Sequence, residues 1–313
     1  MAAPNANYDE ILATTLANHQ ATMIDNVFTA RPFAYFLKQA GQLDVQDGGH
    51  KIVVPNMFEE NSTAGSYSGA DIINTAPQGG ISAIEYDWRQ YAASVVIEGI
   101  EEAKNAGERQ VLSLLKAKIE QAENTIIERM DSMFITSDGT GNGARDWNGL
   151  ANLVAQNSTS VGGIDPATYS WWNSYIESTS TALTVAAMNT AYNPVSEGND
   201  QPGFILTTQS LYEKYESLLQ PNMRYESTEV GDAGFLNLMF KRAPVLFDRY
   251  VTSTYRYFLN PKYLRLVVMS GKFMTPTKFK EPPNQDIRVA QILCYGNLTV
   301  LHRKRQGVLT NRT

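Results

Sequence analysis

The chain has 313 residues, which is enough for about two domains or one large elaborated domain. Its formal net charge of −6 argues against electrostatic capture of nucleic acid, because phosphate binding relies on clustered Lys and Arg. The single cysteine, Cys294, excludes a disulfide framework within the chain, and its apolar neighbours predict a buried thiol. No apolar run approaches the roughly 20 residues that span a bilayer, so we expect no membrane. The N-terminus lacks the features of a signal peptide, which predicts synthesis in a cytoplasm.

The first forty residues predict two helices. Residues 8–28 place apolar side chains at helical spacing, which indicates an amphipathic helix. Pro32 opens a shorter helix over 33–40, and Gly41 suits its C-terminal cap.

Residues 46–98 form a long, strand-rich excursion. A strand is predicted at 50–54, and Pro55 suits an edge or the end of a strand. The stretch 61–80 consists mainly of small and polar residues that favour turns and loops. Over 81–97 apolar and polar residues alternate, which indicates a half-buried strand. Because an isolated hairpin is marginal in water, this arm predicts a partner surface.

A long amphipathic helix follows over 108–135, on the order of 40 Å in length at 1.5 Å per residue. A loop is predicted at 137–143. Beyond it the pattern predicts helices at 183–192 and 208–219, and strands at 204–206, 244–247, 256–259, 264–268 and 286–303.

Searches for catalytic motifs give negative results. His19, His50 and His302 fall in three separate predicted elements, without the paired spacing of a metal site. The stretch 65–69 has Tyr67 where a nucleophile elbow needs serine. The Gly-rich run 139–143 follows a helix, whereas a dinucleotide fingerprint follows a strand, and it lacks the ligand ladder of a calcium loop. We therefore predict no catalytic residue, no cofactor, no metal and no enzyme activity.

The resemblance to a known family is carried by the order and spacing of four stretches: 148–150, 204–212, 243–248 and 284–298. Read together with the excursion and the long helix, they resemble the major capsid proteins of tailed double-stranded DNA phages. The fold of that family is shared with bacterial encapsulins and the herpesvirus capsid floor. The resemblance covers nearly the whole chain and implies an α+β fold of the Hong Kong 97 type.

The resemblance also implies a division of the chain. The corresponding parts are an N-terminal arm at 1–31, a first peripheral part at 32–45, an extended β-hairpin loop at 46–98, a peripheral part with a spine helix at 99–162, an axial domain at 163–280, and a final peripheral strand at 281–313.

As a function, the resemblance implies self-assembly into hexamers and pentamers of an icosahedral capsid. Such a shell encloses double-stranded DNA without sequence-specific binding, and the protein is expected in the virion after assembly in the host cytoplasm. Portal and decoration proteins are implied as further partners. About thirty residues precede Pro32, room for little more than one helix, which implies a separate scaffolding protein or none.

Two sets of residues are candidates for contacts. Arg303, Lys304 and Arg305 are candidates for local nucleic-acid contact, although three charges at the end of a strand are more often a solvated terminus. The candidates for contact between subunits are Met23, Phe28, Tyr67, Asp71, Ile72, Ile73, Glu85, Trp88 and Arg89.

Two alternatives stay open. A cellular, encapsulin-like shell would enclose a cargo protein instead of a genome. A β-rich carbohydrate-active enzyme would need two carboxylates across a cleft at roughly 5 to 9.5 Å, for which Glu85 with Asp87 or Asp146 with Asp165 are the candidates. Sheet packing explains the aromatic residues beside Glu85 and Asp87 equally well.

Overall fold

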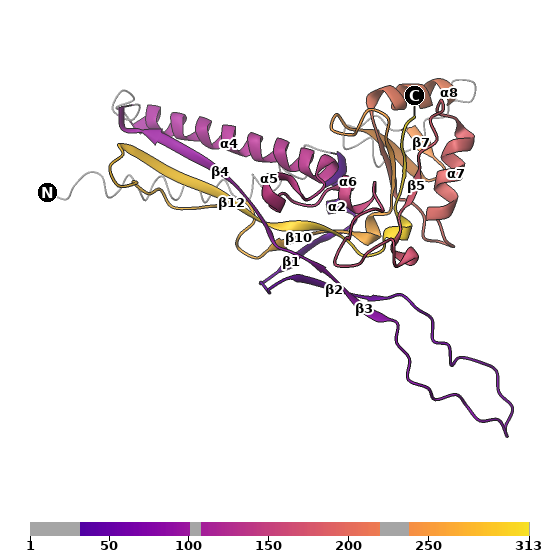
Figure 1. The fold of residues 1–313 in the computed structure, drawn as a ribbon. Coiled ribbons are helices and arrows are strands. Elements are labelled where there is room, and N and C mark those ends of the chain that lie inside the picture. The colour runs from indigo at the N-terminus through magenta and orange to yellow at the C-terminus, as the bar shows by residue number, and fades with distance from the viewer. Residues whose placement is uncertain (1–31, 101–107, 220–237, 313) are drawn as a thin grey trace.

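The computed structural model describes residues 32–100, 108–219 and 238–312, and Figure 1 shows its arrangement. Two sheets with their helices lie side by side, and a two-stranded hairpin projects away from them. The helix expected at 8–28 lies outside the described residues. Within the described ranges, no helix combines the length and apolar character needed to cross a membrane.

The first sheet is built on one long strand, β12, which has 14 residues. Strand β4 pairs antiparallel with it from Glu98↔Ile287 to Arg89↔Gly296. The buried Ile119, Ile126 and Met130 of helix α4 belong to the core beside this sheet, and α4 packs against β4. The elements are β1 (Leu43–Gln46), β4 (Arg89–Glu98), β10 (Leu264–Met269), β11 (Thr275–Pro276), β12 (Ile287–Val300) and α4 (Glu108–Thr136).

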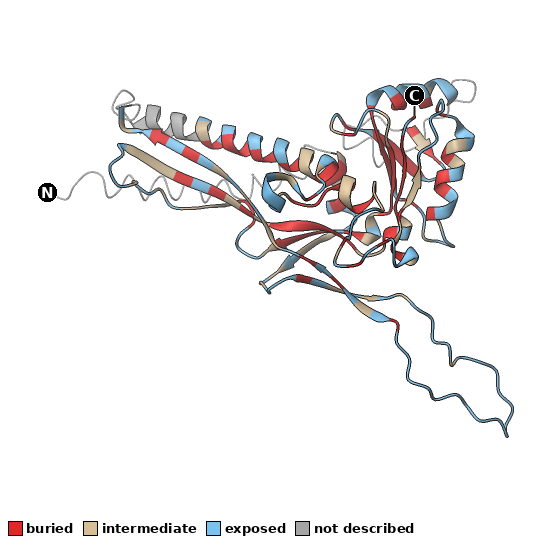
Figure 2. Cartoon of the chain, in the orientation of Figure 1, coloured by how far each residue is buried: buried red, intermediate tan, exposed pale blue. Residues whose placement is uncertain are grey.

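The second sheet lies between two helices and the rest of the body. Ile205 of β6 belongs to the cluster beneath α7 and α8, whereas Phe204 and Leu206 belong to the main core. All side chains of β6 and β9 are therefore buried (Figure 2). In sheet order the strands are β5 (Tyr175–Glu177), β13 (Gly307–Leu309), β9 (Arg256–Leu259), β6 (Phe204–Thr207), β8 (Ala243–Phe247) and β7 (Leu238–Phe240), with α7 (Val185–Val195) and α8 (Gln209–Leu219).

Helix α2 (Pro32–Gln39) joins the two halves of the core. Its buried Phe36 stacks on Phe204 with ring centroids 5.2 Å apart. The helix ends as the sequence predicts, because Gly41 has a φ of +67° that glycine adopts without strain. The short elements are α5 (Gly141–Ala144), α6 (Leu150–Leu153), and the 3₁₀ turns η1 (Ser170–Trp172), η3 (Pro261–Tyr263) and η4 (Arg303–Arg305).

The predicted strand 81–97 is divided in the structure. Strand β3 (Ile81–Tyr86) pairs with β2 (Ile52–Met57), and β4 begins at Arg89 and pairs with β12. Asn297 donates to the carbonyl of Asp87 at 2.9 Å, and the Trp88 indole donates to the carbonyl of Gly49 at 2.9 Å. The prediction of one continuous strand was wrong because the chain changes strand partner at these two residues.

The two sheets also cross the predicted domain limits. Strand β10 lies within 163–280, yet it pairs with β1 and β12 of the first sheet. Strand β13 lies within 281–313, yet it pairs with β5 and β9 of the second sheet. The spine helix and the other helices and strands predicted within the described residues lie within a few residues of where the sequence places them, whereas the short elements β1, β5, β7, β11, β13, α5 and α6 were not predicted.

Candidate functional site

The extended loop, residues 46–98, begins and ends in the body and projects through the hairpin of β2 and β3 (Figure 1). The two strands are in register from Ile52↔Tyr86 to Met57↔Ile81. Ile52, Ile84 and Tyr86 are buried against the body. The hairpin is therefore anchored by one of its faces.

The opposite face of the hairpin is apolar and exposed. Met57 is 79% exposed and its partner Ile81 is 76% exposed. We call this set the outer face, and it consists of Val53, Pro55, Met57, Ile81 and Ala83. The sequence predicts a partner surface on this arm, but the residues of the outer face were not among the predicted contact candidates. The signal of the outer face was present, because β2 carries apolar residues at both odd and even positions and cannot bury both faces alone.

Beyond the hairpin, residues 59–79 form the loop tip. Every side chain of the tip is exposed except that of Thr63, which is half-buried, and Ile72 is 99% exposed. The tip is held by short-range hydrogen bonds, such as Ser68 N–H to Asp71 Oδ2 at 2.8 Å and Ser62 to Gln78 Oε1. The structure thus brings four contact candidates together on an exposed segment: Tyr67, Asp71, Ile72 and Ile73.

The other candidates occupy the base of the loop or lie outside the described residues. Lys51 donates to Glu85 at 2.8 Å, and this bond and the charge of Lys51 hold the pKa of the Glu85 carboxyl below its ordinary value. Trp88 and Arg89 are half-buried where the chain passes from β3 to β4. Met23 and Phe28 lie outside the described residues.

The basic run is not a solvated terminus. Arg303 is 0% exposed and donates to the carbonyls of Leu153 and Gln156, and burial lowers its pKa to about 10. This burial contradicts the prediction that Arg303 contacts nucleic acid. Arg305 is paired with Glu197, and Lys304 is exposed. In the 3₁₀ turn η4 the two arginines point into the body, which a count of adjacent charges cannot reveal.

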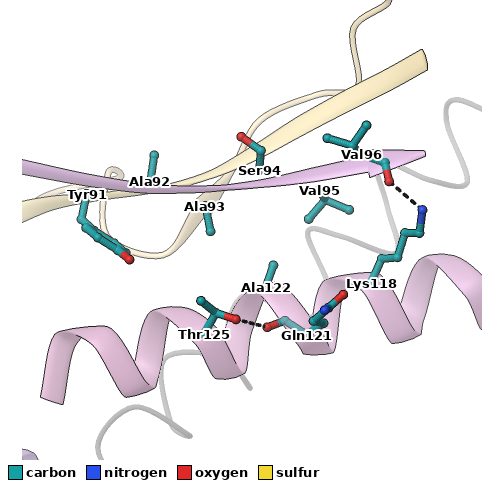
Figure 3. A pocket seen from close by; sticks show the side chains of 10 residues that line it. All are labelled: Tyr91, Ala92, Ala93, Ser94, Val95, Val96, Lys118, Gln121, Ala122 and Thr125. Carbon is teal, nitrogen blue, oxygen red and sulfur yellow. Dashed lines mark hydrogen bonds between the residues drawn. The ribbon is translucent and has the colours of Figure 1, made fainter. Parts of the chain in front are cut away.

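The geometry gives little support to Glu85 and Asp87 as the carboxylate pair of a carbohydrate-active enzyme. Glu85 is engaged by Lys51 on the exposed side of the hairpin, and Asp87 is exposed after β3. A groove of about 470 Å³ lies between β4 and α4 (Figure 3), but its lining contains no carboxylate. Its lining residues are Tyr91, Ala92, Ala93, Ser94, Val95, Val96, Lys118, Gln121, Ala122 and Thr125.

Metal-binding side chains do not cluster in the part of the chain that the structure describes. No three His, Cys, Asp or Glu side chains gather there as a metal site would require. His302 packs edge-on to Tyr263, and its pKa is lowered by burial. Cys294 is buried, as the sequence predicts, and burial raises its thiol pKa to about 12. His50 is exposed, and His19 lies outside the described residues.

Comparison with protein families gives a match between residues 92–313 and the family described as SU10 major capsid protein. The matched region includes α4, most of the first sheet and the whole second sheet. A comparison with curated proteins found no match.

Solved structures with a similar fold include three protein shells. The cyanophage A-1(L) capsid is 16% identical with a TM-score of 0.64, covering 87% of this chain and 90% of the other. The capsid of a native GTA particle is 12% identical, with a TM-score of 0.57 and coverages of 88% and 90%. The SrpI encapsulin of Synechococcus elongatus PCC 7942 is 13% identical, with a TM-score of 0.55 and coverages of 88% and 87%. At these identities the likeness establishes the fold, which is the phage capsid fold expected from the sequence.

Proposed function

Because the chain belongs to the SU10 major capsid protein family and has a structural role in an icosahedral phage capsid, we propose how its copies make contact. In this proposal many copies associate into hexamers and pentamers, and the extended loop of each copy lies over a neighbouring copy. The observation that carries the proposal is the exposed apolar outer face of the hairpin, continued by a fully projecting tip.

Met57 and Ile81 lie opposite each other on paired strands, Val53 lies on the same face of β2, and all three are more than half exposed. Contiguous exposed apolar surface of this kind is typical of protein interaction sites. A neighbouring copy that covered the outer face would remove it from water, and each buried Å² would contribute about 25 cal/mol. Many such contacts sum when the geometry of a closed shell engages them together.

We assign the contact candidates to two zones of this interface. Tyr67, Asp71, Ile72 and Ile73 of the tip would meet the neighbouring copy directly, because they have few neighbours in their own subunit. Glu85, Trp88 and Arg89 at the base already have partners or partial burial within the subunit, so their contribution would be smaller. Met23 and Phe28 would belong to an N-terminal arm beneath a neighbour.

The parts of the shell protein are also a proposal. The first sheet with α4 forms the peripheral domain and the second sheet with α7 and α8 forms the axial domain. The predicted limits are then adjusted so that β10 and β11 join the peripheral domain and β13 joins the axial domain. The N-terminal arm, residues 1–31, and the extended loop keep their predicted limits.

The remaining partners follow from the same role. We propose that the shell encloses double-stranded DNA without sequence-specific binding, with Lys304 as the exposed basic residue of its run. A net charge of −6 suits a container that must load and release its genome. A portal and decoration proteins complete the set, with a separate scaffolding protein or none. Assembly takes place in the host cytoplasm, and the protein has no enzyme activity.

Electron microscopy of the expressed chain, alone and with a candidate scaffold, tests the function. Closed shells are expected in at least one of the two preparations. Stable monomers in both, together with a hydrolytic activity that Glu85→Gln abolishes, would overturn it. The contents of purified shells separate a capsid from the encapsulin-like alternative, which the likeness to SrpI keeps open: DNA supports a capsid, and a single cargo protein supports a compartment.

Deletion of the exposed segment tests the role of the loop. Residues 61–80 are removed, with a two-residue glycine turn in their place. The subunit should still fold, because none of these residues belongs to the hydrophobic core and only Gly80, at the end of the hairpin, is buried. Shells should be lost, as measured by sedimentation. Circular dichroism and thermal unfolding of the same sample provide the control for folding, and unchanged shell formation would contradict the proposal.

A further inference from the structure

A pair of stacked aromatic rings marks the point where the extended loop leaves the body. Phe58 directly follows β2, and its ring centroid lies 5.0 Å from that of Trp171, with 10° between the ring planes. Phe58 continues the series of side chains that face the body, after Ile52, Val54 and Asn56. Beyond it begins the exposed tip, so this ring is the outermost inward-facing side chain on its strand.

The Trp171 side of the pair belongs to the body. Trp171 lies in the 3₁₀ turn η1 and packs edge-on to Trp172 at 5.7 Å. Trp172 is buried, and its indole donates to the carbonyl of Val161 at 2.9 Å. Trp171 is also half-buried against the main core. The ring that Phe58 meets is therefore held in place from below.

The other strand of the hairpin has its own attachment nearby. The backbone N–H of Glu85 donates to the carbonyl of Gly162 at 3.0 Å. At Gly162, where φ is +63°, a Cβ atom would lie 2.1 Å from a methyl group of Ile84, so only glycine permits this approach. Strand β3 is thus fixed to the body by its backbone and core side chains, and the residue after β2 meets the body through the ring of Phe58.

Contacts to the body on both strands of the hairpin fix the direction in which it projects, whereas a contact on one strand alone would leave that direction free. The twist between paired strands varies over a wide range and is larger in two-stranded ribbons, so pairing alone does not set the direction of the hairpin. The last hydrogen bond of the hairpin runs from Phe58 N–H to the carbonyl of Gly80 at 2.9 Å, so a movement of Phe58 carries the opposite strand with it. Stacked aromatic rings favour a defined separation and inclination, which a contact between aliphatic side chains does not impose.

We propose that the stack of Phe58 on Trp171 is a positioning contact that sets the direction of the loop tip and thereby where the tip meets a neighbouring copy. The inference rests on the proposed function, in which the tip makes that contact. Neither ring belongs to the predicted contact candidates, and both act within their own subunit.

The distance between two spin labels within one subunit tests the direction of the tip. One label is placed at Tyr67→Cys on the tip and the other at Glu213→Cys on the exposed side of α8. Cys294 is buried and stays unlabelled. The full chain is used throughout, and labelled chains are diluted with unlabelled chains so that only distances within a subunit are recorded. The variants are Phe58→Ala, Trp171→Ala, the ring-retaining Phe58→Tyr, and Phe247→Ala as a control for loss of a partly exposed ring elsewhere.

The distance distribution of Phe58→Ala and of Trp171→Ala should be about twice as broad as that of the parent, because the ring pair no longer imposes its geometry. Phe58→Tyr and Phe247→Ala should keep the parent distribution. Shell yield by sedimentation should fall roughly tenfold in the two stack-breaking variants and recover in Phe58→Tyr, since a ring pair is comparable to a tenfold change in an equilibrium. Far-ultraviolet circular dichroism checks that the subunits remain folded.

Three results would overturn the proposal or part of it. A parent-like distribution in folded Phe58→Ala overturns the positioning role, and a broad distribution in Phe58→Tyr overturns the role of stacking. Normal shell yield with a broadened distribution overturns the link between direction and assembly. If the parent itself forms no shells, the proposed function fails, while the distance measurement still decides whether the stack directs the tip.

Discussion

In β6 of the second sheet every side chain is buried, whereas in β2 of the extended loop inward-facing side chains alternate with exposed ones. Both strands consist largely of apolar residues. The difference is that β6 is covered on one side by α7 and α8 and on the other by the main core, while β2 has the body on one side and water on the other. The second sheet is covered on both sides within one chain, whereas in the proposed function a neighbouring copy covers the outer face of the extended loop. Changes in the two regions should therefore affect different measurements.

Phe204→Ala should produce the largest change in stability. Phe204 is fully buried, stacks on Phe36 and meets Phe33 edge-on, so it joins α2 to the second sheet. Removing its ring should lower the free energy of unfolding by about 3–5 kcal/mol, through lost burial and the cavity left behind. Chemical denaturation measures the effect, with Phe247→Ala at the exposed end of β8 as the matched control. A loss below that of the control would contradict the assignment of Phe204 to the core.

Ile72→Asp should impair shell assembly and leave the stability of the subunit nearly unchanged. Because Ile72 projects from the tip into water, the free energy of unfolding of the subunit should stay within about 0.5 kcal/mol of the parent. Shell yield by sedimentation should fall, since a carboxylate would be buried unpaired against the neighbouring copy. Ile72→Val keeps the apolar character and should assemble like the parent. Parent-like assembly of Ile72→Asp would remove this residue from the proposed interface.

Glu85→Gln should have the smallest effect, because the pair with Lys51 is exposed and such pairs contribute little to stability. The hydrogen bond from Lys51 and its charge place the pKa of Glu85 below the ordinary 4.5. A carboxyl with a lowered pKa stabilises the fold above its unfolded pKa and loses that contribution as the pH falls through the folded value. The difference in melting temperature between parent and variant should thus be present at neutral pH and vanish on acidification below 4.5.

Lys51→Met is the matched control for this pair. Its difference from the parent should vanish over the same acidic range, because protonated Glu85 no longer attracts Lys51. A difference that persisted in acid would indicate packing of the Lys51 stem in place of the ion pair.

Local patterns in the sequence predicted most of the elements correctly. The apolar stripe of 108–135 identified α4, Gly41 identified the end of α2, and the apolar run around Cys294 identified a buried strand. The alternation over 81–97 correctly indicated strands but could not locate the change of partner at Asp87 and Trp88. Periodicity records which side of a strand is apolar, whereas the choice of partner depends on residues far away in the chain, such as Asn297.

The extended loop was likewise recognised from the sequence, because its small, polar residues cannot form a core of their own. A partner surface was predicted on it, but the residues of the outer face were not identified, since an apolar residue in a strand is by default assigned to a buried side. The structure shows that the contact candidates of the tip are exposed to water. Their contacts with a neighbouring copy remain a proposal. The basic run was misread at Arg303, because three adjacent charges do not reveal that the turn η4 directs one of them to the carbonyls of Leu153 and Gln156.

By itself the sequence determined the composition of each element, the projecting arm and the resemblance to phage capsid proteins, because these depend on the order of residues along the chain. Only the tertiary structure decided which sheet β10 and β13 join, that Arg303 is buried, and that Phe58 meets Trp171. These features each join residues that lie far apart in the chain, such as β1 with β10 and Phe58 with Trp171. Such pairings are selected by the packing of the whole chain, which leaves no periodic pattern at either partner.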